Sequence, residues 1–69
     1  MAVAKIIELV GSSTKDWEDA TKNALAEAAK TIKNIKSIYV KRCNAKVEKN
    51  KIVEYRAVVK IAFLVQREK

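Results

Sequence analysis

The sequence predicts a small α+β domain in which one helix packs against an antiparallel sheet, in the order strand, helix, strand, strand. Three observations predict it. Short stretches rich in Val and Ile have the composition of strands. One segment repeats its apolar residues at helical spacing. Lys49 and Asn50 separate the last two strands, and Asn tolerates the left-handed backbone that a tight turn needs. With 69 residues, the chain forms one domain spanning residues 1–69.

The first strand is expected over Val3–Val10, and the following residues, Gly11 to Ser13, end it. Ser13 is the expected start of the helix, because its hydroxyl can accept a hydrogen bond from the first turn. Asp16 stands three positions later, as in a capping box. Asn34 is the expected helix stop. The apolar stripe predicted to face the sheet consists of Trp17, Ala20, Ala24, Ala28 and Ile32, with Leu25 beside them.

Two long strands are expected after the helix, from about Ile35 to Glu48 and from Ile52 to Val65. On the last strand, every second residue from Val53 to Phe63 is apolar, which predicts one buried face. On the strand before it, the apolar parity changes near Lys41 and Arg42. This change predicts a β-bulge there, or else a strand buried on both sides at one end.

Composition excludes several ways of stabilising so short a chain. Cys43 is the only cysteine and there is no histidine, so neither a disulfide nor a zinc finger is available. A helix of about 20 residues spans ~30 Å, whereas strands of about 13 residues reach ~43 Å. One helix therefore leaves apolar surface and sheet edges uncovered, and proteins rarely leave such edges open. We expect the chain to self-associate into a homo-oligomer.

Enzyme chemistry is not expected. The sequence has no histidine, no glycine-rich phosphate loop and no nucleophile at a recognisable spacing from a base. We expect the thiol of Cys43 to be packed rather than reactive. The net charge of +7 is compatible with nucleic-acid binding. However, the basic residues are spread over all the elements and aromatic residues are few, so a solvated lysine-rich surface is the preferred interpretation.

The location of the protein is predicted from the absence of export and membrane signals. The apolar run from Ile6 to Val10 is interrupted by Glu8 and is too short for a signal peptide. No stretch approaches the ~20 apolar residues of a membrane span. Together with a free cysteine, these features favour the cytoplasm.

Segments along nearly the whole chain resemble the dodecin family. They are Ile6 to Ser13, Ser13 to Ala20, Lys22 to Leu25, Lys30 to Ile32 with Asn34 and Ile35, Lys51 to Tyr55, and Val58 to Phe63. The resemblance implies a β-α-β-β subunit with a three-stranded antiparallel sheet wrapped around one helix. It also implies a hollow shell of twelve subunits that stores flavins. In dodecins, flavins stack between symmetry-related tryptophans, and a glutamine bonds the flavin edge.

This sequence departs from the dodecin pattern at both ligand positions. The stacking tryptophan is expected after the segment Asn34-Ile35-Lys36, but Ser37 stands there. The glutamine is expected after Tyr55, but Arg56 stands there. A tryptophan buries ~150–250 Å², worth up to about 4–6 kcal/mol. Its loss is expected to weaken binding of plain riboflavin strongly.

The two replacements also change the chemistry of the expected ligand. Arginine only donates hydrogen bonds, so it suits a phosphate or carboxylate better than a flavin edge. The expected ligands are therefore anionic, such as FMN or coenzyme A, and the candidate ligand-binding residues are Ser37, Arg56 and Tyr39. Tyr39 is a candidate for part of the missing stacking surface. Trp17 lies on the apolar stripe, so a core or contact role is expected for it instead.

The sequence is also compatible with other functions. Some dodecin-like proteins without the stacking tryptophan are described as binding calcium, and a divalent cation needs several oxygen ligands. The candidate carboxylates are Glu8, Asp16, Glu18, Asp19, Glu48 and Glu54, none of them in a calcium-loop pattern. A site would therefore have to be built across subunits, and ordinary surface carboxylates are the preferred interpretation. A shell that has lost its ligand site and, less favoured, a nucleic-acid-binding module are the remaining alternatives.

Overall fold

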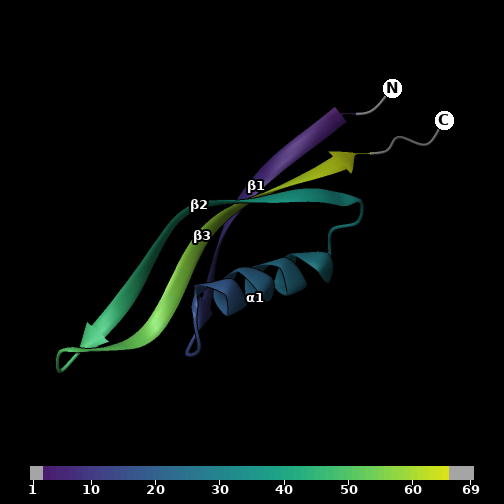
Figure 1. Ribbon diagram of the computed structural model, residues 1–69. Coiled ribbons are helices and arrows are strands. Elements are labelled where there is room, and N and C mark those ends of the chain that lie inside the picture. Colours follow the sequence, from purple (N-terminus) through teal and green to yellow (C-terminus); the bar gives the residue numbers. More distant parts are fainter. Residues whose placement is uncertain (1–2, 66–69) are drawn as a thin grey trace.

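The computed structural model describes residues 3–65 and confirms the predicted β-α-β-β order. Strand β1 spans Val3–Ser13, helix α1 spans Trp17–Ala29, strand β2 spans Ile35–Glu48 and strand β3 spans Lys51–Val65. The strands form one antiparallel sheet in the order β1-β3-β2, so the last strand lies in the centre. Helix α1 lies against one face of this sheet, and the β2–β3 hairpin extends beyond the start of the helix (Figure 1).

The hairpin and the bulge follow the sequence pattern. Lys49 and Asn50 both have positive φ angles, 53° and 65°. A two-residue hairpin turn needs this backbone because its twist matches that of the flanking strands. The pairing of β2 with β3 shifts between Val40 and Arg42, which confirms the predicted bulge. In the single chain β2 is mostly exposed, so burial on both sides is not seen.

The predicted start of the helix at Ser13 is wrong. Strand β1 continues past Val10 to Ser13, because Ser13 still pairs with Tyr55 of β3. Asp16 is the residue that caps the helix, and its Oδ1 accepts a hydrogen bond of 2.7 Å from the N–H of Asp19. The Ser13 hydroxyl instead donates to Asp19 Oδ2 at 2.7 Å and accepts from the N–H of Lys15 at 2.9 Å.

The predicted stop at Asn34 is also misplaced. The helix ends at Ala29, so it has 13 residues rather than about 20. Asn34 does adopt a left-handed backbone, with a φ of 64°, but it does so immediately before β2. Its carbonyl accepts a hydrogen bond of 3.1 Å from the N–H of Leu64. Asn34 therefore turns the chain into the sheet instead of ending the helix.

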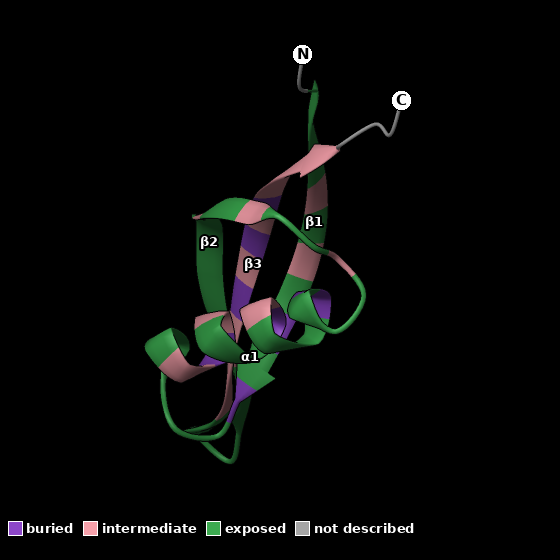
Figure 2. Ribbon diagram, turned by 90° about the vertical axis from the view of Figure 1, so that its right-hand side faces the viewer, coloured by how far each residue is buried: buried purple, intermediate pink, exposed green. Residues whose placement is uncertain are grey.

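The core is a thin layer between α1 and the central strand (Figure 2). Its buried residues are Ala20, Ala24 and Ala28 from the helix and Ala57, Val59 and Ile61 from β3. Most of them have small side chains, and the largest fully buried ones are only Ile61 and Val59. The predicted buried face of β3 is thus confirmed in its middle. Val53 near the hairpin stays 38% exposed, because it lies where the helix no longer covers the strand.

Gly11 lets the helix approach β1 closely. A Cβ atom at this position would lie 2.1 Å from the carbonyl oxygen of Ala20 and 2.8 Å from the Cβ of Ala24. Both contacts are far shorter than van der Waals distances, and one of them is to backbone that cannot move alone. Gly11 is therefore required by packing, and not by an unusual backbone angle.

The helix covers only part of the sheet. Thirteen residues of helix span ~20 Å, whereas strands of 14 and 15 residues reach ~46–50 Å. The Cα atoms extend 57 × 19 × 13 Å, so the subunit is long and thin. One whole face of the sheet and the hairpin end of the other face have no covering element within residues 3–65.

We predict that Gly11→Ala destabilises the protein by about 1–3 kcal/mol, because the added methyl group overpacks the helix contact. In an ordinary strand the same substitution would favour folding by restricting the unfolded chain, so the sign of the effect tests the packing. Thermal denaturation measures it. Ser12→Ala, at an exposed neighbouring side chain, is the control and should melt like the natural sequence. A Gly11→Ala protein as stable as this control would contradict the close approach.

Candidate ligand-binding site

The sheet has a helix-free face whose members follow from strand alternation. Ala57, Val59 and Ile61 point toward α1, so the residues between them point to the opposite side. The register of the strands extends this assignment to β1 and β2. The helix-free face consists of Ile6, Glu8, Val10 and Ser12 from β1, of Ser37, Tyr39, Arg42, Asn44 and Lys46 from β2, and of Glu54, Arg56, Val58, Lys60 and Ala62 from β3.

A shallow depression of about 310 Å³ lies on this face. Its lining comes from all three strands and consists of Ile6, Ser37, Tyr39, Lys60 and Ala62. The register explains the grouping: Ala62 pairs with Ile6 on one side and Ser37 on the other, and Lys60 pairs with Tyr39. The lining is mainly apolar, with a few polar groups, which is the usual character of a small-molecule site.

Two of the depression's residues present usable chemistry. Tyr39 is 62% exposed, so a flat molecule can cover its ring. Lys60 is half-buried on the central strand. Its register partner on β1 is Glu8, but Glu8 Oε2 is 3.6 Å from Lys41 Nζ, which reaches across β3 from the bulge. Within residues 3–65, Lys60 forms no ion pair with a carboxylate.

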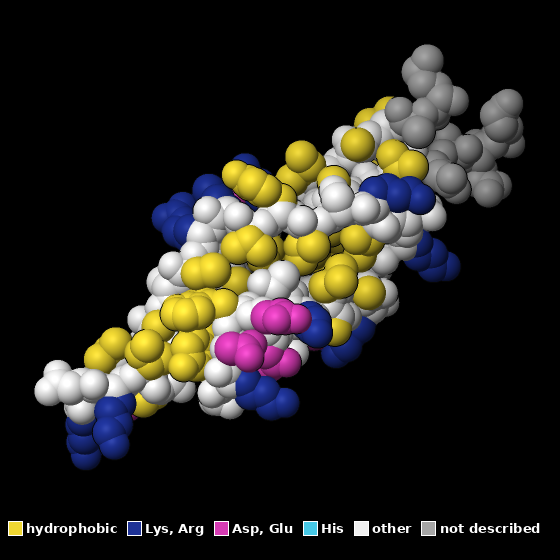
Figure 3. All heavy atoms as spheres, viewed as in Figure 1, with side chains coloured by type: hydrophobic (Ala, Val, Ile, Leu, Met, Phe, Trp, Pro, Cys, Tyr) yellow, Lys and Arg dark blue, Asp and Glu magenta, His cyan; other side chains and the backbone are white. Residues whose placement is uncertain are grey.

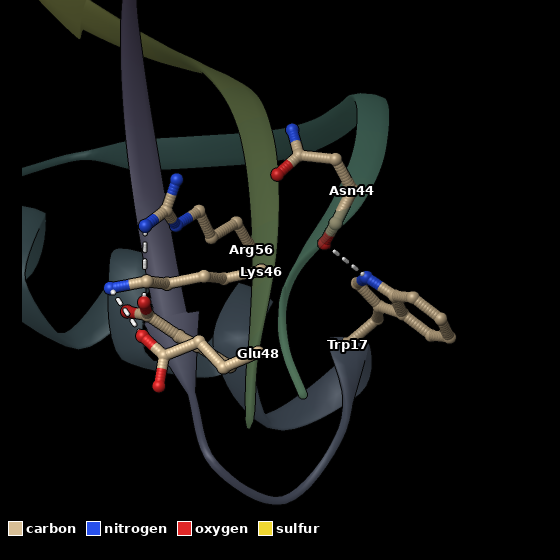
Figure 4. Close-up of polar contacts among 6 residues, drawn as sticks. Trp17, Asn44, Lys46, Glu48 and Arg56 are labelled. Carbon is tan, nitrogen blue, oxygen red and sulfur yellow. Dashed lines mark hydrogen bonds and ion pairs between the residues drawn. The ribbon is translucent and has the colours of Figure 1, made fainter. Parts of the chain in front are cut away.

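The structure does not place Arg56 in this depression. Arg56 lies on the same face, but it is four residues from Lys60 along β3, or about 13 Å. Its Nη2 is 3.1 Å from Oε1 of Glu54, and Lys46 pairs with Glu48 at 3.5 Å beside it (Figure 4). Of the three residues singled out in the sequence, the fold therefore brings Ser37 and Tyr39 together and leaves Arg56 apart.

A second depression of about 460 Å³ lies near the Arg56 end of the sheet. It is lined by Ser12, Ser13, Thr14, Lys46, Val53 and Glu54. Lys46 and Glu54 are register partners on the helix-free face, so the one cation of the lining stands opposite its one anion. The charges of this depression are balanced, and it offers no aromatic surface.

Three lining residues of the 310 Å³ depression were not found from the sequence: Ile6, Lys60 and Ala62. The period-two pattern of β3 does show that Lys60 and Ala62 share a face. The missing information was the strand order, because β3 lies between β1 and β2 and so carries Lys60 next to Tyr39.

Trp17 lies on the other side of the sheet. Its Nε1 donates a hydrogen bond of 2.8 Å to the carbonyl oxygen of Asn44. Its ring meets that of Tyr55 edge to face, with centroids 4.8 Å apart at 82°. Figure 4 shows Trp17 on one side of the hairpin and Arg56 on the other. Trp17 is thus a contact residue that joins the start of the helix to both strands of the hairpin.

The six candidate cation ligands do not gather in one place. Glu8, Glu18, Glu48 and Glu54 each form an ion pair, with Lys41, Lys22, Lys46 and Arg56 respectively. Asp16 caps the helix, and Asp19 accepts from the Ser13 hydroxyl. Across residues 3–65, no group of three or more possible ligands is close enough to hold a metal ion.

Cys43 differs from the expectation. The sequence predicted a packed thiol, but Cys43 is exposed in the single chain. It pairs with Ala57, which places it on the helix side of the sheet. The helix does not cover it, because β2 is an edge strand and α1 packs mainly against β1 and β3.

Comparisons with known proteins agree with this fold. The Dodecin family model matches residues 3–66. The chain belongs to the dodecin family. A dodecin from Thermus thermophilus is 34% identical over 61 residues, which is 88% of each chain. The helix and the sheet superpose on the crystal structure of the tt0972 protein from Thermus thermophilus with a TM-score of 0.92, at 31% identity and with 99% of this chain and 100% of that chain covered.

A more distant dodecin shows the same fold. The calcium dodecin of Mycobacterium tuberculosis, described as calcium chelating, superposes with a TM-score of 0.83 at 24% identity, over 97% of this chain and 96% of its own. In this chain, no helix within residues 3–65 is long and apolar enough to cross a membrane.

We predict that Trp17→Phe lowers the free energy of unfolding by about 1 kcal/mol, because the hydrogen bond to Asn44 is lost while most of the ring contact is kept. Trp17→Ala should cost more, about 3 kcal/mol, since the ring contact is lost as well. Urea denaturation measures both. Ligand affinity should be the same in Trp17→Phe and in the natural sequence, because Trp17 and the depression lie on opposite faces. A loss of binding in Trp17→Phe with intact assembly would contradict this placement.

Proposed function

We propose that this dodecin is a subunit of a hollow homo-oligomer of twelve copies that binds and stores an anionic small molecule in the cytoplasm, without catalysing its conversion. The observation that carries the proposal is the depression around Tyr39 and Lys60 on the helix-free face. It combines an open aromatic ring, apolar walls and one cation, and it lies in a chain whose family membership is shown.

Uncovered apolar surface supports the oligomer. Large exposed hydrophobic residues occur on all three strands and at the helix start: Val3, Ile6, Val10, Trp17, Tyr39, Val40, Val47, Ile52 and Val53. In Figure 3, hydrophobic side chains follow the molecule from the hairpin end toward the helix. Both β1 and β2 are also free sheet edges. A core of six residues, five of them no larger than valine, leaves a lone subunit poorly stabilised.

The shape of the depression supports a ligand site shared between copies. Small-molecule sites usually bury 70–90% of their ligand, which a shallow depression on one sheet face cannot do. Two copies placed face to face would cover a ligand from both sides. In the same way, a second copy could bring an Arg56 to a ligand held by Ser37 and Tyr39. The dodecin resemblance suggests such an arrangement, with ligands stacked around a symmetry axis.

The residue at the stacking position determines which ligand fits. Ser37 offers a hydroxyl where the family pattern has a tryptophan, so a neutral flavin loses most of its stacking surface here. An anionic ligand can recover affinity through the cations on the same face. We therefore propose FMN, coenzyme A or another phosphate compound in preference to riboflavin. A divalent cation, as in the calcium dodecin, would need carboxylates from more than one copy.

Native mass spectrometry of the purified protein tests the assembly. Twelve copies of the 7.8 kDa chain weigh about 94 kDa. We expect this mass, with discrete adducts that identify the retained ligand by mass difference. A mass of twelve subunits without any adduct would refute the prediction that the purified protein retains a ligand. A monomer or dimer would refute the shell.

We predict that Ser37→Trp tightens riboflavin binding by a factor of ten or more, because the new ring restores stacking surface in the depression. Quenching of flavin fluorescence measures the affinity. The control is Ser12→Trp, which adds the same ring to the same face of the sheet. Ser12 lies six positions along β1 from Ile6, so it is about 20 Å from that wall of the depression. Equal affinities in the two variants would contradict a flavin site at Ser37.

A further inference from the structure

We infer that Lys60, and not Arg56, selects the charge of the ligand, and that the depression takes a flat aromatic molecule whose anionic group meets the Lys60 ammonium while its ring covers Tyr39. The inference rests on the proposed function and specifies its site. Two observations support it. The strand register places Lys60 opposite Tyr39, and the neighbouring residues Glu8 and Arg56 are already engaged in ion pairs.

Lys60 and Tyr39 are adjacent on two paired strands. Residues opposite each other in an antiparallel pair have Cβ atoms about 4.5–5.5 Å apart, and both side chains stand on the same face. A ligand whose ring covers Tyr39 therefore brings its substituents within reach of the flexible lysine stem. The walls formed by Ile6 and Ala62 offer no competing charge.

The carboxylate that could neutralise Lys60 is engaged elsewhere. Glu8 pairs with Lys41 from the bulge in β2, at 3.6 Å. The bulge is what turns two successive β2 residues, Lys41 and Arg42, toward the helix-free face, since Arg42 pairs with Val58 there. The local charge of Glu8, Lys41 and Lys60 together is therefore positive, and it is centred next to the depression.

Covering Lys60 has opposite consequences for neutral and anionic ligands. A neutral molecule that covers the ammonium removes water from a charge and gives no partner in return, which is unfavourable. An anionic molecule replaces that water with a charge-assisted hydrogen bond. Lys60 thus both favours the anion and disfavours its neutral counterpart, which is how one residue produces selectivity.

Arg56 cannot supply the same selectivity from its own subunit. Its guanidinium already bonds the Glu54 carboxylate at 3.1 Å, and that carboxylate would repel an incoming anion. It also lies about 13 Å along β3 from Lys60, beyond the depression that holds Tyr39.

FMN and riboflavin test the inference, because they share one ring system and differ in a phosphate. Their affinities are measured by calorimetry on the assembled protein, for the natural sequence and for Lys60→Gln, Lys60→Arg and Arg56→Gln. We expect the natural protein to prefer FMN. Lys60→Gln should weaken FMN binding about tenfold and leave riboflavin binding unchanged or tighter. Lys60→Arg and Arg56→Gln should both keep the preference.

Two controls separate local from general effects. Lys5→Gln removes the same charge from an exposed residue on the helix side of β1, so it should keep the FMN preference. In the natural protein, added salt should weaken FMN binding more than riboflavin binding, because only the former includes a charge pair. This salt measurement needs no variant, so it tests the charge pair even where Lys60→Gln does not assemble.

The outcomes distinguish the two proposals. A preference for FMN that survives Lys60→Gln and disappears in Arg56→Gln overturns the role of Lys60 and leaves the storage function standing. The same holds where FMN and riboflavin bind equally, or where salt affects both alike. An assembled natural protein that binds neither flavin, nor coenzyme A as a further anionic aromatic probe, overturns both proposals.

Discussion

The close contact between α1 and the sheet is the constraint on which the rest of the structure depends. Gly11 has no Cβ, and the helix presents only alanines at its three buried positions, so the helix lies close to the strands. Such contact leaves room for few large side chains, and among residues 3–65 the largest fully buried ones are Val59 and Ile61. The same closeness keeps the core small. A helix of 13 residues in this position cannot cover strands of 14 and 15, so one face of the sheet and the hairpin end are left without a partner in the subunit.

The uncovered face links the fold to the proposed self-association and ligand binding. Apolar residues on a sheet face that water reaches contribute little to the stability of one chain, but they contribute when a second chain covers them. The depression of Tyr39 and Lys60 lies on this face, so the surface that favours assembly also contains the candidate site. Under the proposed function, binding and assembly would be coupled, because a ligand held between copies would stabilise the oligomer by mass action and the oligomer would complete the site. In that case, stability and function would depend on the same surface, which the small core leaves uncovered.

Local features were predictable from the sequence, and non-local ones were not. The order of elements, the Lys49–Asn50 turn and the bulge near Lys41 depend on neighbouring residues, and the structure confirms them. The helix start was misplaced because the pairing of Ser13 with Tyr55, 42 residues away, holds Ser13 in the sheet. Cys43 was expected to be packed, but strand order leaves it uncovered on an edge.

For the candidate site, Ser37 and Tyr39 were identified from the resemblance to dodecins, which runs along the chain. Lys60 could be identified as a lining residue only from the strand order, because no local sequence pattern shows that β3 is the central strand.

The fold changes the interpretation of the net charge of +7. On composition alone, the charge is a property of the whole surface, and most of the lysines are exposed. Several charged residues of the helix-free face form ion pairs: Glu54 with Arg56, Lys46 with Glu48, and Glu8 with Lys41. Lys60 is the cation of that face that lies in an apolar depression beside an aromatic ring. Twelve copies would carry about +84 in total, and each anion bound at Lys60 would reduce the repulsion among them. Under the proposed function, the positive charge of each subunit would therefore favour a shell that holds anions.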